Sequence, residues 1–118
     1  MNLTIKFKNH PEYLFAKVVG KWIQPDANLL LEELKNKSEE FEKKIILIDA
    51  HELTLPNTEF VRFSTGEKIA ALFSYSYKIA VISQPEKTNK FTETVAVNRG
   101  ANFKVFYSES EAKEWLLS

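Results

Sequence analysis

Apolar and polar residues alternate at the start of the chain, a pattern typical of a β-strand with one buried face. The alternation covers residues 3–8, Leu-Thr-Ile-Lys-Phe-Lys. Residues 9–12 then have the composition of a turn, and residues 13–19 form a second strand-like segment that ends at Gly20. Strands joined by so short a connection must be antiparallel. The sequence therefore begins with a predicted antiparallel hairpin.

Further along the chain, the apolar residues form continuous runs. Residues 45–48 are Ile-Ile-Leu-Ile, residues 79–82 are Ile-Ala-Val-Ile, and residues 103–107 resemble a third segment of this kind. Continuous apolar runs are typical of strands that are covered on both faces, as in parallel sheets. These three segments are predicted to be adjacent parallel strands.

Between the strands, apolar residues recur at spacings of three and four, which predicts helices. The first helix follows Pro25 and Asp26 and carries charged residues on its outer side. Pro85 and Glu86 are predicted to open the third helix. Ser108 and Glu111 have the spacing of a capping box, which predicts the start of the last helix.

The second helix is predicted to begin at Asn57 or Thr58 and to carry an inward apolar stripe. The stripe consists of Phe60, Phe63, Ala70 and Phe73, with Ile69 and Leu72 beside it. Gly66 lies inside this helix, where it costs about 1 kcal/mol relative to Ala. A close approach of a neighbouring backbone would explain the glycine.

The predicted element order is β-β-α-β-α-β-α-β-α, an α/β fold. Alternating strands and helices require crossover connections, so the three central strands should be parallel, and the hairpin adds an antiparallel edge. We therefore predict a small mixed sheet with four helices. With no internal repeat or linker, residues 1–118 should form one domain.

Composition and charge exclude several classes of function. Sixteen basic residues balance sixteen acidic ones, so no net field favours nucleic acid. The chain has no Cys, and its apolar runs are too short to cross a bilayer. We expect a cytoplasmic protein with no transmembrane segment and no nucleic-acid partner.

Catalytic and cofactor motifs are also missing. The only glycines are Gly20, Gly66 and Gly100, which cannot form a phosphate loop or a dinucleotide fingerprint. His10 and His51 have no metal-ligand spacing, and Asp49 with His51 lacks an accompanying nucleophile. We expect no cofactor, no metal and no enzymatic activity.

Several segments together resemble the SpoIIAA-like, or STAS-type, family. They are Gly20 followed by Gln24-Pro25-Asp26, Ile-Ile-Leu-Ile-Asp at 45–49, Gly-Glu-Lys-Ile-Ala at 66–70, Ala-Val-Asn-Arg-Gly-Ala-Asn at 96–102, and Glu-Ala-Lys-Glu-Trp-Leu at 111–116. The resemblance implies a mixed sheet with packed helices and a non-enzymatic regulatory or binding module.

The best-known members of that family are anti-sigma-factor antagonists. Phosphorylation of a Ser in an Asp-Ser-Ser-Gly type motif after the third strand controls their docking to a kinase partner. In this chain Asp49 occupies the strand end, but residues 50–58 contain no Ser, and Thr58 supplies the hydroxyl at the start of the next helix. The chain more closely resembles an uncharacterised branch whose fold is also compared with the CRAL-TRIO lipid-binding domain.

Gly100 directly follows the third predicted helix, where glycine closes the last turn without Cβ strain. A structural role at this helix end explains most of Asn98-Arg99-Gly100, and a direct ligand role for Asn98 or Arg99 is the less favoured interpretation. We therefore interpret Gly100 as a structural C-cap.

Ligands of parallel sheets bind outside the carboxyl ends of the strands. In this chain, that rim would include loop 50–57 and the start of the second helix. Leu53 and Leu55 are predicted apolar contacts, Thr58 a helix-start hydroxyl and Arg62 an orienting charge. The leading hypothesis is a protein-interaction module, and self-association is one form of it.

The alternative hypothesis is a carrier for a small molecule or lipid. It would hold its ligand in an apolar pocket between the second helix and the sheet. The pocket would be lined by Phe60, Phe63 and Leu72.

Overall fold

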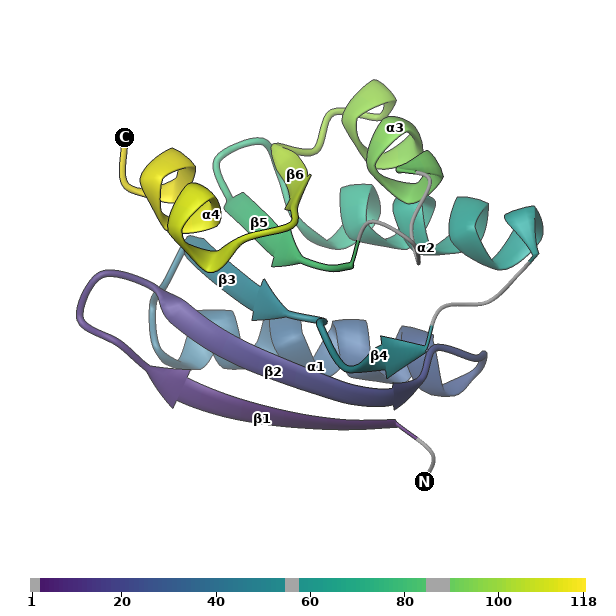
Figure 1. The fold of residues 1–118 in the computed structure, drawn as a ribbon, viewed down its shortest axis with the longest axis horizontal. Coiled ribbons are helices and arrows are strands. Elements are labelled where there is room, and N and C mark those ends of the chain that lie inside the picture. The colour runs from purple at the N-terminus through teal and green to yellow at the C-terminus, as the bar shows by residue number, and fades with distance from the viewer. Residues whose placement is uncertain (1–2, 55–57, 85–89) are drawn as a thin grey trace.

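Residues 3–54, 58–84 and 90–118 are described by the structure, a computed structural model. Within these residues, six strands form one mixed sheet (Figure 1). The sheet has the order β1-β2-β3-β5-β6, and a short strand, β4 (Leu53–Thr54), lies beside β2. Five of the strands are β1 (Leu3–Asn9), β2 (Leu14–Lys21), β3 (Ile45–Asp49), β5 (Lys78–Ile82) and β6 (Phe103–Phe106).

The strand directions agree with the prediction. β1 and β2 are antiparallel, whereas β3 is parallel to β5 and β5 is parallel to β6. β2 is also parallel to β3, so the hairpin joins the parallel part of the sheet through its second strand. The predicted hairpin and the three adjacent parallel strands are confirmed.

The loop predicted over residues 50–57 contains a short strand, β4 (Leu53–Thr54). β2 extends beyond the end of β3, and β4 pairs in parallel with this extension, with Leu53 opposite Gly20. The Trp22 N–H also donates to the Thr54 carbonyl at 2.9 Å. The prediction of a loop at these two residues is wrong because the backbone groups of β2 past β3 need hydrogen-bond partners.

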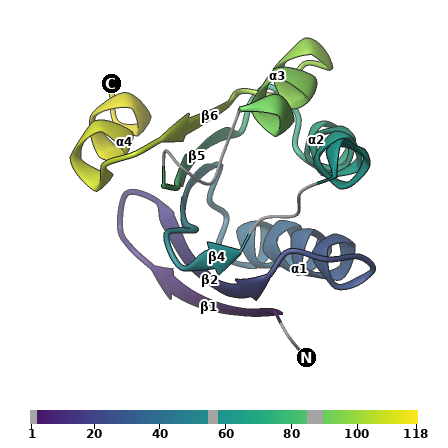
Figure 2. The ribbon, with the colours of Figure 1, turned by 45° about the vertical axis from the view of Figure 1, so that its right-hand side comes forward.

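Helices cover both faces of the sheet. α1 (Asp26–Glu40), α2 (Glu59–Leu72) and α3 (Phe91–Asn98) lie on one side, and α4 (Glu109–Leu116) lies on the other (Figure 2). The alternation of side chains across the central strands supplies both cores. Ile46, Ile48 and Ile79 face the three-helix side, whereas Leu47 and Ala80 face α4. This burial on two faces explains the continuous apolar runs.

The helix ends agree with the sequence in two places. The Ser108 hydroxyl accepts a hydrogen bond from the Glu111 N–H at 3.2 Å, as the capping-box spacing predicted. After α3, Gly100 has φ of +98°, and its N–H donates to the Val97 carbonyl at 3.0 Å. The predicted start of the third helix at Pro85 and Glu86 lies outside the described residues, and the described helix begins at Phe91.

The predicted inward stripe of α2 is only partly correct. Phe73, directly after α2, is buried, but the side chain of Phe60 is 73% exposed. The buried positions within the helix are Thr65, Gly66 and Ile69. The inward face is therefore rotated relative to the prediction, and it carries small residues where other helices approach.

Gly66 is the point where α3 approaches most closely. A Cβ at this position would lie 2.8 Å from the Cβ of Val95 and 2.9 Å from the main-chain oxygen of Thr92. Real Cβ atoms do not approach other atoms so closely, and a main-chain oxygen cannot rotate away. The expectation that Gly66 allows a close backbone approach is confirmed.

We predict that Gly66→Ala destabilises the protein by a net ~1–2 kcal/mol. The overlap with α3 includes a main-chain oxygen that cannot move aside, so it should cost about 2–3 kcal/mol, and the better helix propensity of Ala returns about 1 kcal/mol. Urea unfolding followed by circular dichroism measures the difference. Ser64→Ala, on the same helix but partly exposed, is the control and should stay within about 0.5 kcal/mol of the natural protein. An unchanged or raised stability of Gly66→Ala would contradict the packing described here.

Gly100 gives a second prediction, with a different physical cause. No atom outside its chain neighbours lies within 4 Å of a Cβ built there, so a substitution meets no steric obstacle. Its positive φ still disfavours residues with a Cβ, and Gly100→Ala should lose about 1–2 kcal/mol. Gly100→Asn should lose less, because Asn tolerates left-handed backbone. Equal unfolding midpoints for the Ala variant and the natural protein would argue against this explanation.

Candidate functional site

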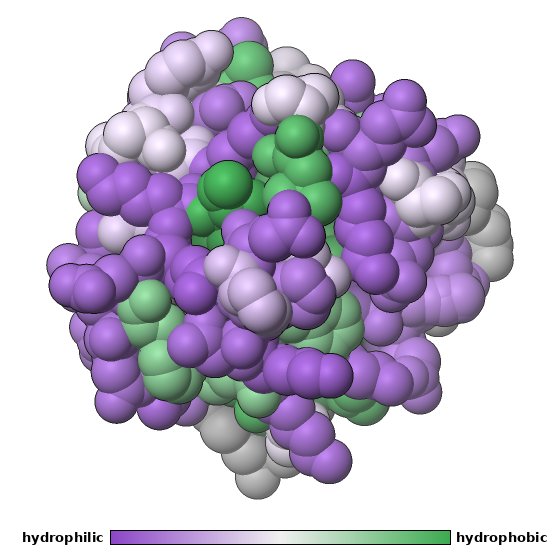
Figure 3. All heavy atoms as spheres, turned by 90° about the vertical axis from the view of Figure 1, so that its left-hand side faces the viewer, coloured by the Kyte–Doolittle hydropathy of each residue, from purple (hydrophilic) through white to green (hydrophobic). Residues whose placement is uncertain are grey.

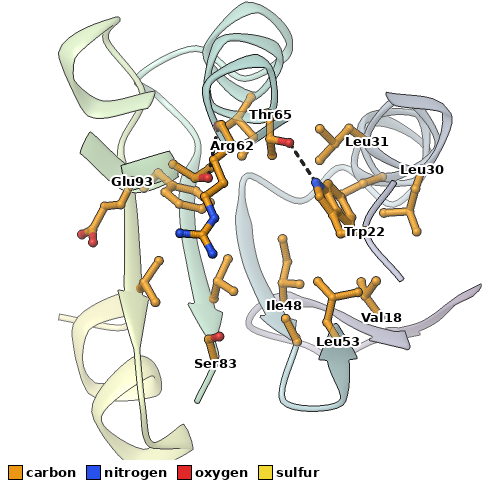
Figure 4. A pocket seen from close by; sticks show the side chains of 17 residues that line it. Val18, Trp22, Leu30, Leu31, Ile48, Leu53, Arg62, Thr65, Ser83 and Glu93 are labelled. Atoms are coloured by element: carbon orange, nitrogen blue, oxygen red, sulfur yellow. Dashed lines mark hydrogen bonds between the residues drawn. The ribbon is translucent and has the colours of Figure 1, made fainter. Parts of the chain in front are cut away.

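A mostly apolar cavity of about 100 Å³ lies between the sheet and the three helices on its larger face (Figure 4). Strands β2, β3, β5 and β6 supply Val18, Ile48, Val81 and Val105, and the helices supply residues such as Leu30 and Ile69. The cavity is partly open to the surface. Because protein interiors normally leave few voids larger than a water molecule, this space is a distinct feature of the core.

One wall of the cavity is held by a buried hydrogen bond. The Trp22 indole N–H donates to the Thr65 hydroxyl at 2.8 Å (Figure 4). That hydroxyl donates to the Val61 carbonyl at 2.8 Å. The bond joins the segment after β2 to α2. Since both polar groups have partners, they can line an apolar space without a desolvation penalty.

Sequence reasoning did not identify Trp22 as part of a site. A signal was available, because the inward alternation of Leu14, Ala16 and Val18 along β2 continues in register to Trp22. The alternation is interrupted at Gly20, which hides it. The partner, Thr65, was not identified because a polar residue at a helical position does not by itself indicate burial.

Among the described lining residues, Arg62 extends a charged side chain into the cavity region. In Figure 4 it points from α2 toward Ser83, at the end of β5, whereas Glu93 on α3 points away. Arg62, Thr65 and Ile69 follow one another at spacings of three and four, so they form one face of α2. The Thr92 hydroxyl donates to the Arg62 carbonyl at 3.1 Å, which fixes this turn against α3.

The other predicted contact residues are separated. Leu53 lines the cavity and is only 5% exposed, so it cannot be the surface contact that was predicted for a protein partner. Its pairing in β4 turns the side chain inward. Leu55 lies outside the described residues. Thr58 is exposed at the start of α2, and its hydroxyl caps no N–H of that helix. The structure thus brings Leu53 and Arg62 together and leaves Thr58 on the surface.

The pocket expected between the second helix and the sheet has a different lining from the one predicted. Phe60, Phe63 and Leu72 do not line it, whereas Arg62, Thr65 and Ile69 do. The cause is the rotation of α2 described above. Phe63 instead lies under the guanidinium of Arg99, 4.9 Å from its ring centroid, and Arg99 also pairs with Glu67 at 3.3 Å.

The loop after β3 is held by local contacts. Asp49 accepts a hydrogen bond from the His51 main-chain N–H at 3.0 Å, and Gln84 donates to the His51 carbonyl at 2.8 Å. Glu52 pairs with Lys17 at 2.8 Å, and this hydrogen bond lowers the pKa of Glu52 and raises that of Lys17. The side chains of Asp49 and Glu52 and the main chain of His51 thus have structural roles.

Over residues 3–54, 58–84 and 90–118, no three His, Cys, Asp or Glu side chains gather in a way that could hold a metal ion. No helix in the same ranges is long and apolar enough to cross a membrane.

The outer surface differs between regions of the molecule. The end that carries the β1–β2 turn and α4 is largely hydrophilic, with a few apolar side chains between polar ones (Figure 3). At the start of α2, by contrast, a large aromatic side chain, that of Phe60, faces solvent. We name Thr58, Glu59 and Phe60 together the α2-start surface.

The fold is similar to that of known structures along nearly its whole length. An anti-sigma factor antagonist from Mycobacterium paratuberculosis matches with a TM-score of 0.69 and 13% identity, over 98% of this chain and 95% of that one. An uncharacterized protein of the DUF3478 family with a SpoIIAA-like fold, from Shewanella loihica PV-4, matches with a TM-score of 0.60 and 24% identity, over 98% of this chain and 94% of that one.

Comparison by sequence gives no match. No protein-family model and no curated protein matches the chain. The likeness therefore rests on the three-dimensional arrangement, and it shows the fold. The chain has a SpoIIAA-like α/β fold, in which the described residues form a mixed sheet and four helices.

Proposed function

We propose that the chain is a non-catalytic regulatory module that binds another protein through the α2-start surface. The observation that carries this proposal is Phe60, whose side chain is 73% exposed in the first turn of a helix. Large aromatic residues dominate the energetics of protein interfaces, and an exposed one is a suitable anchor for a partner pocket.

The neighbouring groups support the same surface. Glu59 and Thr58 are both exposed beside Phe60, and they provide a charge and a hydroxyl at the edge of an apolar contact. An apolar centre with polar groups at its edge is the usual composition of a protein interface. Leu55 stays a predicted contact, and Leu53 is not part of this surface because it is buried.

The fold comparison supports another protein as the binding partner. One matched structure is described as an anti-sigma factor antagonist, a protein whose description implies action on another protein. The match covers almost all of both chains. We therefore propose that this chain also has a regulatory role through protein binding. The crosslinking experiment described next identifies the partner.

We predict that a photo-crosslinking amino acid at position 60 captures a specific protein in cells of the source organism. The same amino acid at position 75 is the control, because Tyr75 is 71% exposed but lies beyond the other end of α2. Mass spectrometry of the crosslinked products should show a protein captured from position 60 and not from position 75.

The captured protein is then purified, and its affinity is measured by calorimetry. Phe60→Ser should weaken binding by about 30-fold, since burial of a Phe side chain contributes about 2 kcal/mol. Tyr75→Ser should leave the affinity unchanged. Equal affinities for Phe60→Ser and the natural protein would contradict the proposed surface, and capture of a second copy of this chain alone would replace the regulatory role with self-association.

A further inference from the structure

We infer that the cavity under α2 binds a small uncharged aliphatic molecule of about four carbon atoms. This inference does not rest on the proposed role of the α2-start surface. It rests on the volume of the cavity, the apolar character of its described lining, and the contacts that hold α2 above the sheet.

The contacts of α2 explain why the space beneath it is retained. An empty space in a core shrinks when the surrounding elements can move inward, and it stays large where they are held. On one flank of α2, Thr65 accepts the hydrogen bond from Trp22 at 2.8 Å. On the other flank, a Cβ at Gly66 would lie 2.9 Å from the main-chain oxygen of Thr92, so α3 stands directly against the helix.

The volume of the cavity sets the size of the ligand. An engineered apolar cavity of about 150 Å³ holds benzene, which has six carbon atoms. In proportion, about 100 Å³ accommodates about four carbon atoms. Because the cavity is partly open to the surface, a molecule of this size has a route of entry.

The described lining favours a hydrocarbon over water. Most of its side chains are apolar, and those from the long strands are Val18, Ile48, Val81, Phe103 and Val105. Water is stable in a buried site only where it finds several polar partners. A hydrocarbon needs none, its burial removes apolar surface from water, and it gives the lining atoms the neighbours that an empty space denies them.

Several polar groups of the described lining are already engaged within the protein. The Trp22 indole N–H is bonded to the Thr65 hydroxyl, which itself donates to the Val61 carbonyl. The Thr92 hydroxyl donates to the Arg62 carbonyl, and Arg62 has a further interaction of its own. A polar ligand would have to compete with these contacts or leave its own groups unpaired, which weakens binding. An aliphatic ligand avoids both costs.

The probe for this inference is 2-methylpropane, with acetamide as a polar control that has the same number of non-hydrogen atoms. The natural protein is titrated with each compound, the gas over a series of pressures, and binding is followed by methyl NMR. The signals of Val18, Ile48, Val81 and Val105 should shift with 2-methylpropane in a saturable way. Its affinity should exceed that of acetamide by about tenfold or more, because burial of an amide without partners is unfavourable.

The core under α4 provides a control within the same spectrum. Ala112 and Leu116 are buried there, on the opposite side of the sheet from the cavity. Their methyl signals should stay unchanged at gas pressures that saturate the cavity. Shifts of equal size in both cores would indicate uptake by the interior in general, and they would overturn the inference.

Two variants change the cavity volume in opposite directions. Val81→Phe fills the space and should abolish binding of 2-methylpropane. Ile69→Val gives room for one more carbon, so it should bind cyclopentane about fourfold more tightly than the natural protein does, the contribution of one buried CH₂ group. Ile82→Val makes the same change in the core under α4, and its affinity for cyclopentane should equal that of the natural protein.

The inference is overturned if 2-methylpropane gives no saturable shift at the cavity methyl groups, or if acetamide binds as tightly. It is also overturned if a folded Val81→Phe variant binds 2-methylpropane as the natural protein does. Should Val81→Phe not fold, the Ile69→Val comparison decides, and an unchanged affinity for cyclopentane contradicts the inference. None of these results depends on whether a protein partner binds Phe60.

Discussion

The close contact between α2 and α3 at Gly66 is the constraint on which the rest of this structure depends. Val95 and the Thr92 carbonyl occupy the space that a Cβ at Gly66 would need, so α3 lies against α2 at backbone distance. The same approach lets the Thr92 hydroxyl reach the Arg62 carbonyl. With α3 held there on one side and Trp22 bonded to Thr65 on the other, α2 is fixed over the sheet from both sides. The cavity is the space beneath a helix that is supported at its flanks.

The sheet contributes the other half of this arrangement. β3 ends at Asp49, and the chain then turns to place β4 beside the extension of β2, while the Ala50 N–H still donates to the Ile82 carbonyl of β5 at 2.9 Å. The strands therefore diverge at their carboxyl ends, which is where parallel sheets generally bind their ligands. Leu53 faces the cavity from one branch and Ser83 from the other (Figure 4). Local contacts of Asp49 and Glu52 hold the turn between the branches, so the divergence is a built feature of the fold.

The fold could be predicted from the sequence because its signals are local and repeat along each element. The apolar runs that begin at Ile45 and Ile79 indicated strands buried on both faces, and Gly66 indicated a close backbone approach. The site was harder to predict, since its parts depend on the rotation of one helix and on the pairing of two residues. Because α2 is rotated relative to the prediction, Phe60 faces solvent and Arg62 faces the cavity, the reverse of their expected orientations. Leu53 is buried because β4 pairs with β2. Neither event leaves a periodic signal in the sequence.

The cavity and the α2-start surface share α2 but lie on different sides of it. Consecutive helical residues are about 100° apart, so Phe60 and Arg62 lie about 200° apart around the axis, one toward solvent and one toward the cavity. A ligand in the cavity would alter the affinity for a protein partner only if it bound the free and partner-bound forms of α2 with different free energies. The contacts at Gly66 and Thr65 oppose such a change, because they hold the helix on both flanks. Coupling between the cavity and the α2-start surface would therefore require α2 to move against these contacts.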